Sequence, residues 1–236
     1  ATKNVELDIQ EKLAFKNQNV FKKSFERKNL AYIVLYEEDK FGRLLKITKS
    51  LNGIGVVYVR TRKKTKEIAD FLKRNKVSAE AYNAGMTSAE RTKVQDNWMK
   101  EKTRVVVATN AFGMGIDKGN VRFVVHVDSP ESLEAYYQEA GRAGRDEQKA
   151  FGILLFNKND REELEQRVDL TFPDIQKIKA VYQALGNYYQ LPVESGKGVS
   201  FNFDLYNSCN NYNFNMSETY NCLKVLELQG MIALND

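Results

Sequence analysis

Cysteine, histidine and proline are scarce in this sequence of 236 residues, which has two cysteines, one histidine and three prolines. Cys209 and Cys222 stand apart with no second pair, so the sequence predicts neither a zinc site nor a disulfide framework. No uninterrupted apolar run approaches the roughly 20 residues that cross a bilayer, and residues 1–10 are too charged for a signal peptide. We therefore expect a soluble, cytoplasmic protein in a reducing compartment, with no membrane partner.

The rest of the composition is ordinary for a globular protein, with 42% hydrophobic and 28% charged residues. These values exclude a collagen-like, disordered or disulfide-stapled chain. The net charge of +5 permits a polyanionic partner, but it is small enough to belong to a solvated surface. Both interpretations stay open at this point.

The charge is unevenly distributed along the chain. Residues 1–50 carry 11 basic and 7 acidic side chains, residues 51–170 carry 21 and 18, and residues 171–236 carry 4 and 6. The last segment also holds 10 of the 26 aromatic residues. We therefore predict three segments, with boundaries near residues 50 and 170.

The middle segment alternates between strand and helix patterns. Helical patterns appear around Ile68–Leu72, after a capping box at Thr87–Glu90, and from about Ser132 to Ala140. Short apolar runs that read as strands are 55–59, 79–82, 104–108, 121–127 and 151–156. Strands buried on both faces and separated by helices predict a doubly wound α/β domain, a parallel sheet with crossover helices.

The first fifty residues look incomplete as a domain. Val5, Ile9 and Leu13 recur at the spacing of one helix face, Leu30–Tyr36 reads as a strand, and Asp39–Lys49 reads as a helix. A helix that opens the sequence without a preceding strand leads us to expect that it is the end of an earlier domain.

Chemistry is expected beyond the carboxyl ends of the strands, where open parallel sheets bind ligands. One such segment is Thr109–Asp117, in which Gly113 and Gly115 permit close backbone approach and Asp117 can accept ribose hydroxyls. Taken alone, this spacing is weak evidence, because glycines in tight turns are the commoner explanation.

A second segment follows the helix that begins near Ser132. Arg142 and Arg145 are three residues apart, so two guanidinium groups can converge on one phosphate if the turn is helical. Arginine is also the residue that stabilises charge on a transferring phosphoryl group. The alternative is that both arginines form surface salt bridges with Glu139, Asp146 or Glu147.

Other candidates are weaker. His126 closes a buried run and has no adjacent acid or thiol, so a core or strand-end role is favoured over catalysis. Gly196–Gly198 resembles a fragment of a phosphate loop, but Leu191 occupies the position of the required first glycine. No complete phosphate loop and no Mg²⁺-binding acidic pair follow any strand. An arginine pair without a phosphate cradle predicts half of a site.

Three stretches make a family resemblance specific. They are Arg104–Asp117, Val121–His126 and Tyr136–Asp146, and the first and last resemble motifs V and VI of the RecQ family of superfamily 2 DNA helicases. The resemblance runs from about Val5 to Phe156, roughly two thirds of the chain. Two motifs in this order and at this spacing are highly specific for that family.

The resemblance implies an enzyme that couples ATP hydrolysis to 3′-to-5′ unwinding of DNA through two RecA-like domains. Residues 1–50 would then be the end of the first domain and a linker, and residues 51–170 would be the second domain. The first domain of the same protein would hold most of the ATP and its Mg²⁺. The implied partners are single-stranded and forked DNA, and in a bacterium the protein would be associated with the nucleoid.

The resemblance also assigns roles to residues. Arg145 matches the arginine finger on the γ-phosphate, Arg142 its partner, and Gln138 a position at the same surface. Gly115 and Asp117 match positions near the nucleotide ribose and the domain interface. The residues matched to contacts with the phosphates of single-stranded DNA are Thr61, Arg62, Asn83, Gly85 and Thr109.

Two departures from the family pattern matter. Asn83 stands where the family often has histidine, which weakens any proton-related role there. The family usually continues into a four-cysteine zinc module, and this sequence has none, so we expect no zinc in this chain.

The segment 171–236 instead resembles a truncated winged helix. The predicted elements are helices at 174–189, 204–212 and 217–229, a strand at 199–203 and a wing that begins at Met231. Its net charge of −2 leaves open whether it contacts DNA, packs on the helicase domain or binds a protein.

The predicted function is the C-terminal half of an ATP-dependent DNA helicase, inactive alone because the phosphate loop is absent. The alternative is a stand-alone RecA-like domain that binds nucleic acid or acts as a scaffold without ATPase activity. An RNA helicase of the same superfamily is disfavoured, because Ala111–Ile116 and Tyr136–Gln138 follow the RecQ form.

Overall fold

The computed structural model describes residues 3–16, 19–21, 26–113, 115–192 and 195–235. The strands are β1 (Leu30–Tyr36), β2 (Ile54–Tyr58), β3 (Ala79–Tyr82), β4 (Val105–Ala108), β5 (Val121–His126) and β6 (Ala150–Phe156). The helices are α1 (Lys3–Lys12), α2 (Lys40–Ser50), α3 (Arg62–Arg74), α4 (Ser88–Met99), α5 (Leu133–Ala140), α6 (Lys158–Thr171), α7 (Ile175–Tyr188), α8 (Leu205–Tyr212) and α9 (Met216–Leu228).

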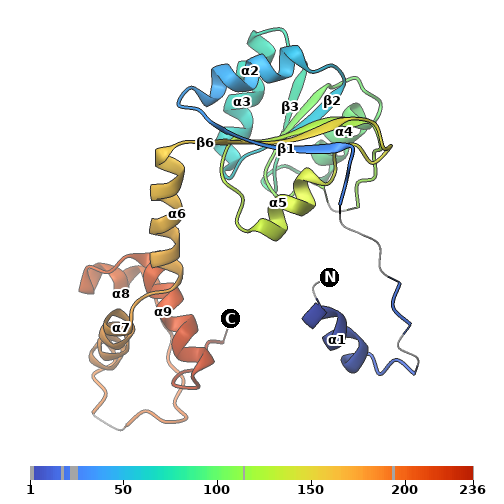
Figure 1. Ribbon diagram of the computed structural model, residues 1–236. Helices are drawn as coiled ribbons and strands as arrows, with labels where there is room; N and C mark the ends of the chain where they lie inside the picture. The colour runs from blue at the N-terminus through green and yellow to red at the C-terminus, as the bar shows by residue number, and fades with distance from the viewer. Residues whose placement is uncertain (1–2, 17–18, 22–25, 114, 193–194, 236) are drawn as a thin grey trace.

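The strands form one parallel sheet with the order β1-β6-β5-β2-β4-β3. Helices α2 and α3 cover one face, and α4 and α5 cover the other (Figure 1). This arrangement confirms the predicted parallel sheet with crossover helices. Because the strands are parallel, their carboxyl ends lie at one edge of the sheet, where the candidate residues are expected.

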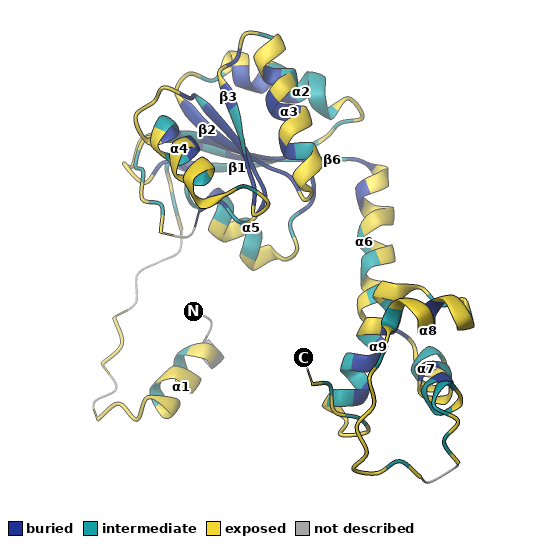
Figure 2. Cartoon of the chain, turned by 180° about the vertical axis from the view of Figure 1, so that it is seen from behind, coloured by how far each residue is buried: buried dark blue, intermediate teal, exposed yellow. Residues whose placement is uncertain are grey.

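The central strands are buried on both faces, which explains their continuous apolar sequence. Every residue of β2 and β4 is buried, and Figure 2 shows the sheet as the buried layer between more exposed helices. On the α4 side, Trp98 is buried, contacts the Phe112 ring edge-on and donates its indole N–H to the Gly55 carbonyl at 3.2 Å. This contact ties α4 and the segment after β4 to the sheet.

Residues 30–50 belong to the sheet domain, whereas the sequence placed them before a boundary near residue 50. Strand β1 pairs with β6 along its whole length, from Leu30 opposite Ala150 to Tyr36 opposite Phe156. The partner strand lies 120 positions later in the sequence, so no local pattern could reveal the pairing. The assignment of the preceding residues to the end of another domain stays a prediction.

Helix α6 joins the sheet domain to the C-terminal helices and was not predicted. It begins at a capping box formed by Asn157 and Asp160. Asp160 also accepts a 2.6 Å hydrogen bond from Lys40, and both side chains are largely buried, so the start of α6 is fixed to the sheet domain. At its other end, the Leu170 carbonyl accepts from the Asn221 side chain at 2.8 Å. The domain change therefore occurs along α6.

The three C-terminal helices confirm the predicted helices, with Asn215 rather than Ser217 as the N-cap of α9. The predicted strands at 199–203 and from Met231 are wrong, because both segments are irregular in the part of the chain that the structure describes. No strand lies beside them in the described sheet, and Phe203, Ile232 and Leu234 instead pack on the small core around Val181 and Cys222. Val199, Phe201 and Met231 are exposed. The winged-helix assignment stays a prediction.

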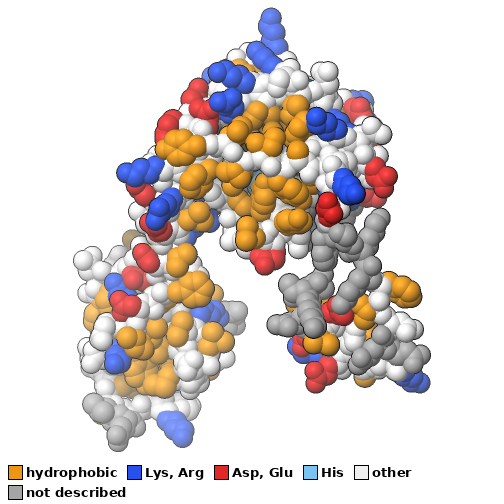
Figure 3. Space-filling model, viewed as in Figure 1, with side chains coloured by type: hydrophobic (Ala, Val, Ile, Leu, Met, Phe, Trp, Pro, Cys, Tyr) orange, Lys and Arg blue, Asp and Glu red, His pale blue; other side chains and the backbone are white. Residues whose placement is uncertain are grey.

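One apolar surface of the sheet domain is uncovered. Side chains of alternate β1 residues and of α5 form this surface, and Figure 3 shows hydrophobic side chains gathered there. Its exposed members are Tyr32, Val34, Tyr36, Leu133 and Tyr137.

Among the described residues, no helix is long and apolar enough to cross a membrane.

The buried cysteines give a test of the C-terminal core. Burial raises the pKa of the Cys222 thiol to about 11, and Cys209 is also buried. Because the folded-state pKa lies above the unfolded value, Cys222 contributes stability below the unfolded pKa of 9.0, and this contribution is lost as pH rises toward 11.

We therefore expect both thiols to react with a chromogenic disulfide at ~pH 8 no faster than the C-terminal core opens. The control is Ser200→Cys, which adds a thiol at an exposed position and should react at once. Immediate reaction of Cys209 and Cys222 in native buffer would show that this core is not formed.

Candidate functional site

Two segments hold the predicted nucleotide-contacting residues other than Gln138. The first begins at the carboxyl end of β4, whereas the second lies at the amino ends of β5 and β6, where the Gly144 N–H donates to the Val121 carbonyl at 2.8 Å. We call Thr109–Asp117, after β4, the glycine loop, and Gly141–Asp146, after α5, the arginine turn. Arg142 and Arg145 both reach from the arginine turn to the glycine loop. The structure thus brings together two motifs that are about 30 residues apart in the sequence.

Local sequence explains why the arginine turn leaves the helix. Ser132 caps the start of α5, and the helix ends at Ala140. Gly144 has φ +63°, and an added Cβ would lie 2.7 Å from the Asn29 side-chain nitrogen and 2.8 Å from the Ala150 Cβ. Only glycine fits this position without displacing its neighbours. The turn is therefore not a continued helix, and its two arginines contact different positions of the glycine loop.

Arg142 connects the arginine turn to the glycine loop. Its Nη1 donates to the Gly113 carbonyl, while its Nε is buried and has no hydrogen-bond partner among the described residues. It lies beside Tyr58, whose hydroxyl donates to the Phe112 carbonyl at 2.9 Å. Burial raises the pKa of Tyr58 far above its usual value, and Arg142 only partly offsets this rise.

Arg145 is the more accessible arginine. Its Nη1 donates to Asp117 Oδ1 at 2.8 Å and to the Ile116 carbonyl at 3.3 Å. The Arg145 side chain is 37% exposed and that of Asp117 is 86% exposed. An ion pair this open contributes little to stability, so the guanidinium can exchange partners at small cost.

The other two predicted nucleotide contacts are also at the surface. Gly115 has φ +73° and open space around its Cα, so it allows the left-handed conformation of the glycine loop. Gln138 is exposed in the last turn of α5, just before the arginine turn.

Salt bridges other than those considered from the sequence hold the nearby carboxylates. Glu139 contacts His126 Nε2 at 2.8 Å. Asp146 accepts two hydrogen bonds from Arg122, at 2.6 and 2.5 Å, and this contact lowers the pKa of Asp146. The partner of Arg145 is instead Asp117, on the glycine loop.

His126 has the buried strand-end position that was favoured from the sequence, with 1% of its surface exposed. The acid that local sequence could not show is Glu139, which α5 brings to it. Both line a cavity of about 220 Å³ that also contains Thr61 and Asn110.

The residues matched to DNA phosphates also lie together. Thr61 caps α3 and accepts from the Lys64 N–H at 3.2 Å. Asn83 donates to Thr65 at 2.9 Å and accepts from the Gly85 N–H at 3.0 Å. These bonds connect the start of α3 with the loop after β3.

Arg62 and Thr109 complete this group. The Arg62 guanidinium lies 3.0 Å from where a Cβ on Gly85 would be. The Thr109 N–H donates to the carbonyl of Tyr82, the last residue of β3, at 3.3 Å. Helices α3 and α4 both begin at the carboxyl edge of the sheet, so their positive dipole ends favour an anion there.

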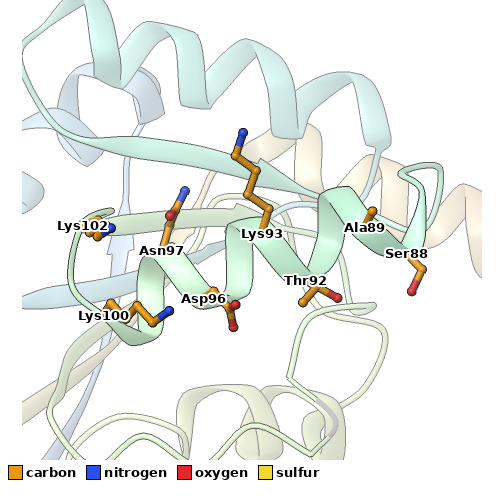
Figure 4. A pocket seen from close by; sticks show the side chains of 8 residues that line it. All are labelled: Ser88, Ala89, Thr92, Lys93, Asp96, Asn97, Lys100 and Lys102. Atoms are coloured by element: carbon orange, nitrogen blue, oxygen red, sulfur yellow. The ribbon is translucent and has the colours of Figure 1, made fainter.

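A shallow hollow along the outer side of α4 holds none of the predicted residues (Figure 4). Its lining includes Lys93, Lys100 and Lys102. Among the described residues, no three His, Cys, Asp or Glu side chains are grouped so that they could hold a metal ion.

Sequence reasoning missed two residues that hold the arginine turn. Arg27 and Asn29, just before β1, donate to carbonyl groups of residues 141–148. They lie more than 110 positions earlier in the chain, so no local signal marks them.

Comparison with known proteins identifies relatives of this region. Residues 39–147 match the family described as "Helicase conserved C-terminal domain". The chain is 43% identical over 157 residues to the ATP-dependent DNA helicase RecQ of Haemophilus influenzae, covering 65% of this chain and 25% of that protein. It is 41% identical over 162 residues to the enzyme of the same name from Bacillus subtilis, covering 68% and 27%. The chain thus spans about a quarter of the length of these curated relatives.

A solved structure supports the RecA-like fold of the sheet domain. The DEAD-box protein SrmB of E. coli, solved bound to the regulator of ribonuclease activity A, superposes with a TM-score of 0.52 at 25% identity. The match covers 59% of this chain and 83% of that one.

Proposed function

Because this chain carries a helicase C-terminal domain of the RecQ family, we propose that it supplies one wall of the ATP site and part of the DNA track of an ATP-dependent DNA helicase. The observation that carries this proposal is Arg145, an exposed guanidinium on a constrained turn, in a sequence without a phosphate loop. An exposed guanidinium with no phosphate loop in the same sequence needs a second protein surface to complete a phosphate-binding site.

In this proposal Arg145 leaves Asp117 and contacts the γ-phosphate when the first RecA-like domain closes on the second. The guanidinium then stabilises the negative charge that develops on the transferring phosphoryl group. Hydrolysis thus depends on closure, and closure becomes relative motion of the domains. Arg142 stays in place and holds the glycine loop against the arginine turn.

We assign the phosphate cradle and the Mg²⁺ ligands to the first domain, which the sequence resemblance places before this one. Bound Mg²⁺ would neutralise charge on the β- and γ-phosphates. In this chain Gly115 and Asp117 would face the nucleotide ribose, and Gln138 would lie at the same surface.

The DNA track is assigned to Thr61, Arg62, Asn83, Gly85 and Thr109. Hydroxyls, backbone amides and one guanidinium bind phosphates without reading bases, which suits an enzyme that moves along any sequence. The 3′-to-5′ direction of movement and the use of forked DNA rest on the family resemblance.

The Arg62→Ala substitution tests the DNA track. We expect weaker binding of this chain to single-stranded DNA of every sequence, with the slope of log K against log salt reduced by about 0.7, the value for one phosphate contact. Fluorescence anisotropy with a mixed-sequence oligonucleotide at several salt concentrations measures both. The control is Arg74→Ala at the opposite end of α3. An unchanged slope for Arg62→Ala would remove it from the track.

The half-site idea is tested on this chain without substitution. We expect no DNA-stimulated ATP hydrolysis from the chain alone, because it has no phosphate loop. Robust turnover by the purified chain that is absent from an identically prepared Arg145→Ala variant would contradict the proposal, because the activity would then belong to this chain alone.

A further inference from the structure

The arginine turn is held from outside by two side chains that precede β1. Arg27 Nη2 donates to the carbonyls of Gly144 at 2.6 Å and Ala143 at 3.1 Å, and its Nη1 donates to the Gly141 carbonyl at 3.4 Å. One guanidinium therefore binds three carbonyl groups of a six-residue turn. Arg27 is half-buried, so these bonds are partly shielded from water.

Asn29 adds a second set of bonds to the same turn. Its amide donates to the Gly144 carbonyl at 2.7 Å and to the Gln148 carbonyl at 2.9 Å. The Asn29 carbonyl accepts from the Ala150 N–H at 2.9 Å, so the residue is itself fixed to the start of β6. The side-chain bonds span the turn, and the backbone bond sets their position.

The chemistry of a helix end explains why such a clamp is useful. Carbonyls in the last turn of α5 accept from N–H groups of the arginine turn itself, since Tyr137, Glu139 and Ala140 accept from residues 141–143. The next carbonyls, those of Gly141, Ala143 and Gly144, lie beyond the helix near the negative end of its dipole, and the Arg27 guanidinium satisfies them and compensates their charge. The bound carbonyls flank Arg142 and lie next to Arg145, so they fix the backbone from which both arginines project.

We infer that Arg27 and Asn29 are positioning residues for Arg145, and this inference rests on the proposed arginine-finger function. They touch no reacting atom. They hold the turn so that the guanidinium of Arg145 reaches the γ-phosphate without reordering of the backbone.

The test is steady-state ATP hydrolysis by the full-length protein with Arg27→Met, which keeps the length of the side chain and removes its donors. We expect kcat to fall by about 10- to 100-fold while KM for ATP changes by less than about threefold, because misplacement affects the transition state more than nucleotide binding. Arg27→Lys should recover part of the loss. Asn29→Ala, a milder change, should lower kcat by about tenfold and provides the test if Arg27→Met does not fold.

The matched control is Arg104→Met. Arg104 also binds two backbone carbonyls at the amino edge of the sheet, but these belong to Leu51 and Gly53 and not to the arginine turn. It should leave kcat near the wild-type value. An equal loss of kcat in Arg27→Met and Arg104→Met would overturn the inference, because general destabilisation would then explain both.

A double substitution separates positioning from other effects. In an Arg145→Ala background, Arg27→Met should cause no further loss, because the group that it positions is gone. If Arg145→Ala itself hydrolyses ATP normally, the proposed function fails. If Arg145→Ala is inactive but Arg27→Met and Asn29→Ala turn over like wild type, only the positioning role fails.

Discussion

Replacing Arg145 with alanine in the full-length protein should reduce ATP turnover by about 10³- to 10⁵-fold and leave ATP affinity nearly unchanged. The size of this loss follows from the charge that an arginine finger stabilises only in the transition state. Affinity should change little because the cradle for the phosphates is assigned to the other domain. The exposed ion pair with Asp117 is worth little in the folded protein, so stability should hold as well.

Single-turnover hydrolysis and equilibrium binding of a fluorescent ATP analogue measure the two quantities separately. Arg161→Ala is the matched control, since Arg161 is an exposed arginine on α6 with one ion pair to Glu165 and no contact with the arginine turn. Its turnover should equal that of wild type. Normal hydrolysis by Arg145→Ala, or an equal loss in both variants, would refute the finger assignment.

Local signals in the sequence were sufficient for most helices and strands. The capping box at Thr87 and Glu90 and the helical pattern from about Ser132 predict helix starts that the structure confirms. The continuous apolar runs of β2 and β4 predict strands covered on both faces, because a polar residue there would be buried without a partner. Such features depend on neighbours within a few positions.

Features that depend on distant partners were not predictable in this way. The pairing of β1 with β6, and therefore the start of the sheet domain, is decided by hydrogen bonds across 120 positions. The two strands expected in the C-terminal segment have suitable residues, but no described strand lies beside them. Strand propensity alone does not stabilise a strand without a neighbour.

The candidate site shows the same division. The rule for parallel sheets located the start of the glycine loop at the carboxyl end of β4 but not the arginine turn, which lies at the amino ends of β5 and β6. The two segments meet because Arg142 and Arg145 both reach the glycine loop. The different contacts of Arg142 and Arg145 did not follow, because their spacing suggested one helical face. The turn at Gly141–Asp146 separates them, so Arg142 connects the turn to the glycine loop and Arg145 is accessible.

Replacing Gly113 with alanine should lower ATP turnover of the full-length protein by about 100-fold. The added Cβ would lie 2.2 Å from Arg142 Cζ, far inside van der Waals contact. Gly113 also has φ +133°, a conformation that alanine rarely adopts, at a cost of order 1–3 kcal/mol. The Arg142 guanidinium must move, and the contact that joins the arginine turn to the glycine loop is lost.

The control for backbone strain is Gly198→Ala. Gly198 also has positive φ, at +75°, but nothing lies within 4 Å of its Cβ position, and it belongs to the C-terminal segment. Its turnover should match that of wild type. Thermal unfolding of both variants shows how much of any loss is general destabilisation.

The decisive comparison is Gly113→Ala in an Arg142→Ala background. If collision with the guanidinium causes the loss, the two substitutions are strongly non-additive, and Gly113→Ala costs little more than its backbone strain once the guanidinium is gone. Additive losses would instead show that Gly113 acts through the conformation of its own loop. The contact between Arg142 and the Gly113 carbonyl would then not be what couples the arginine turn to the glycine loop.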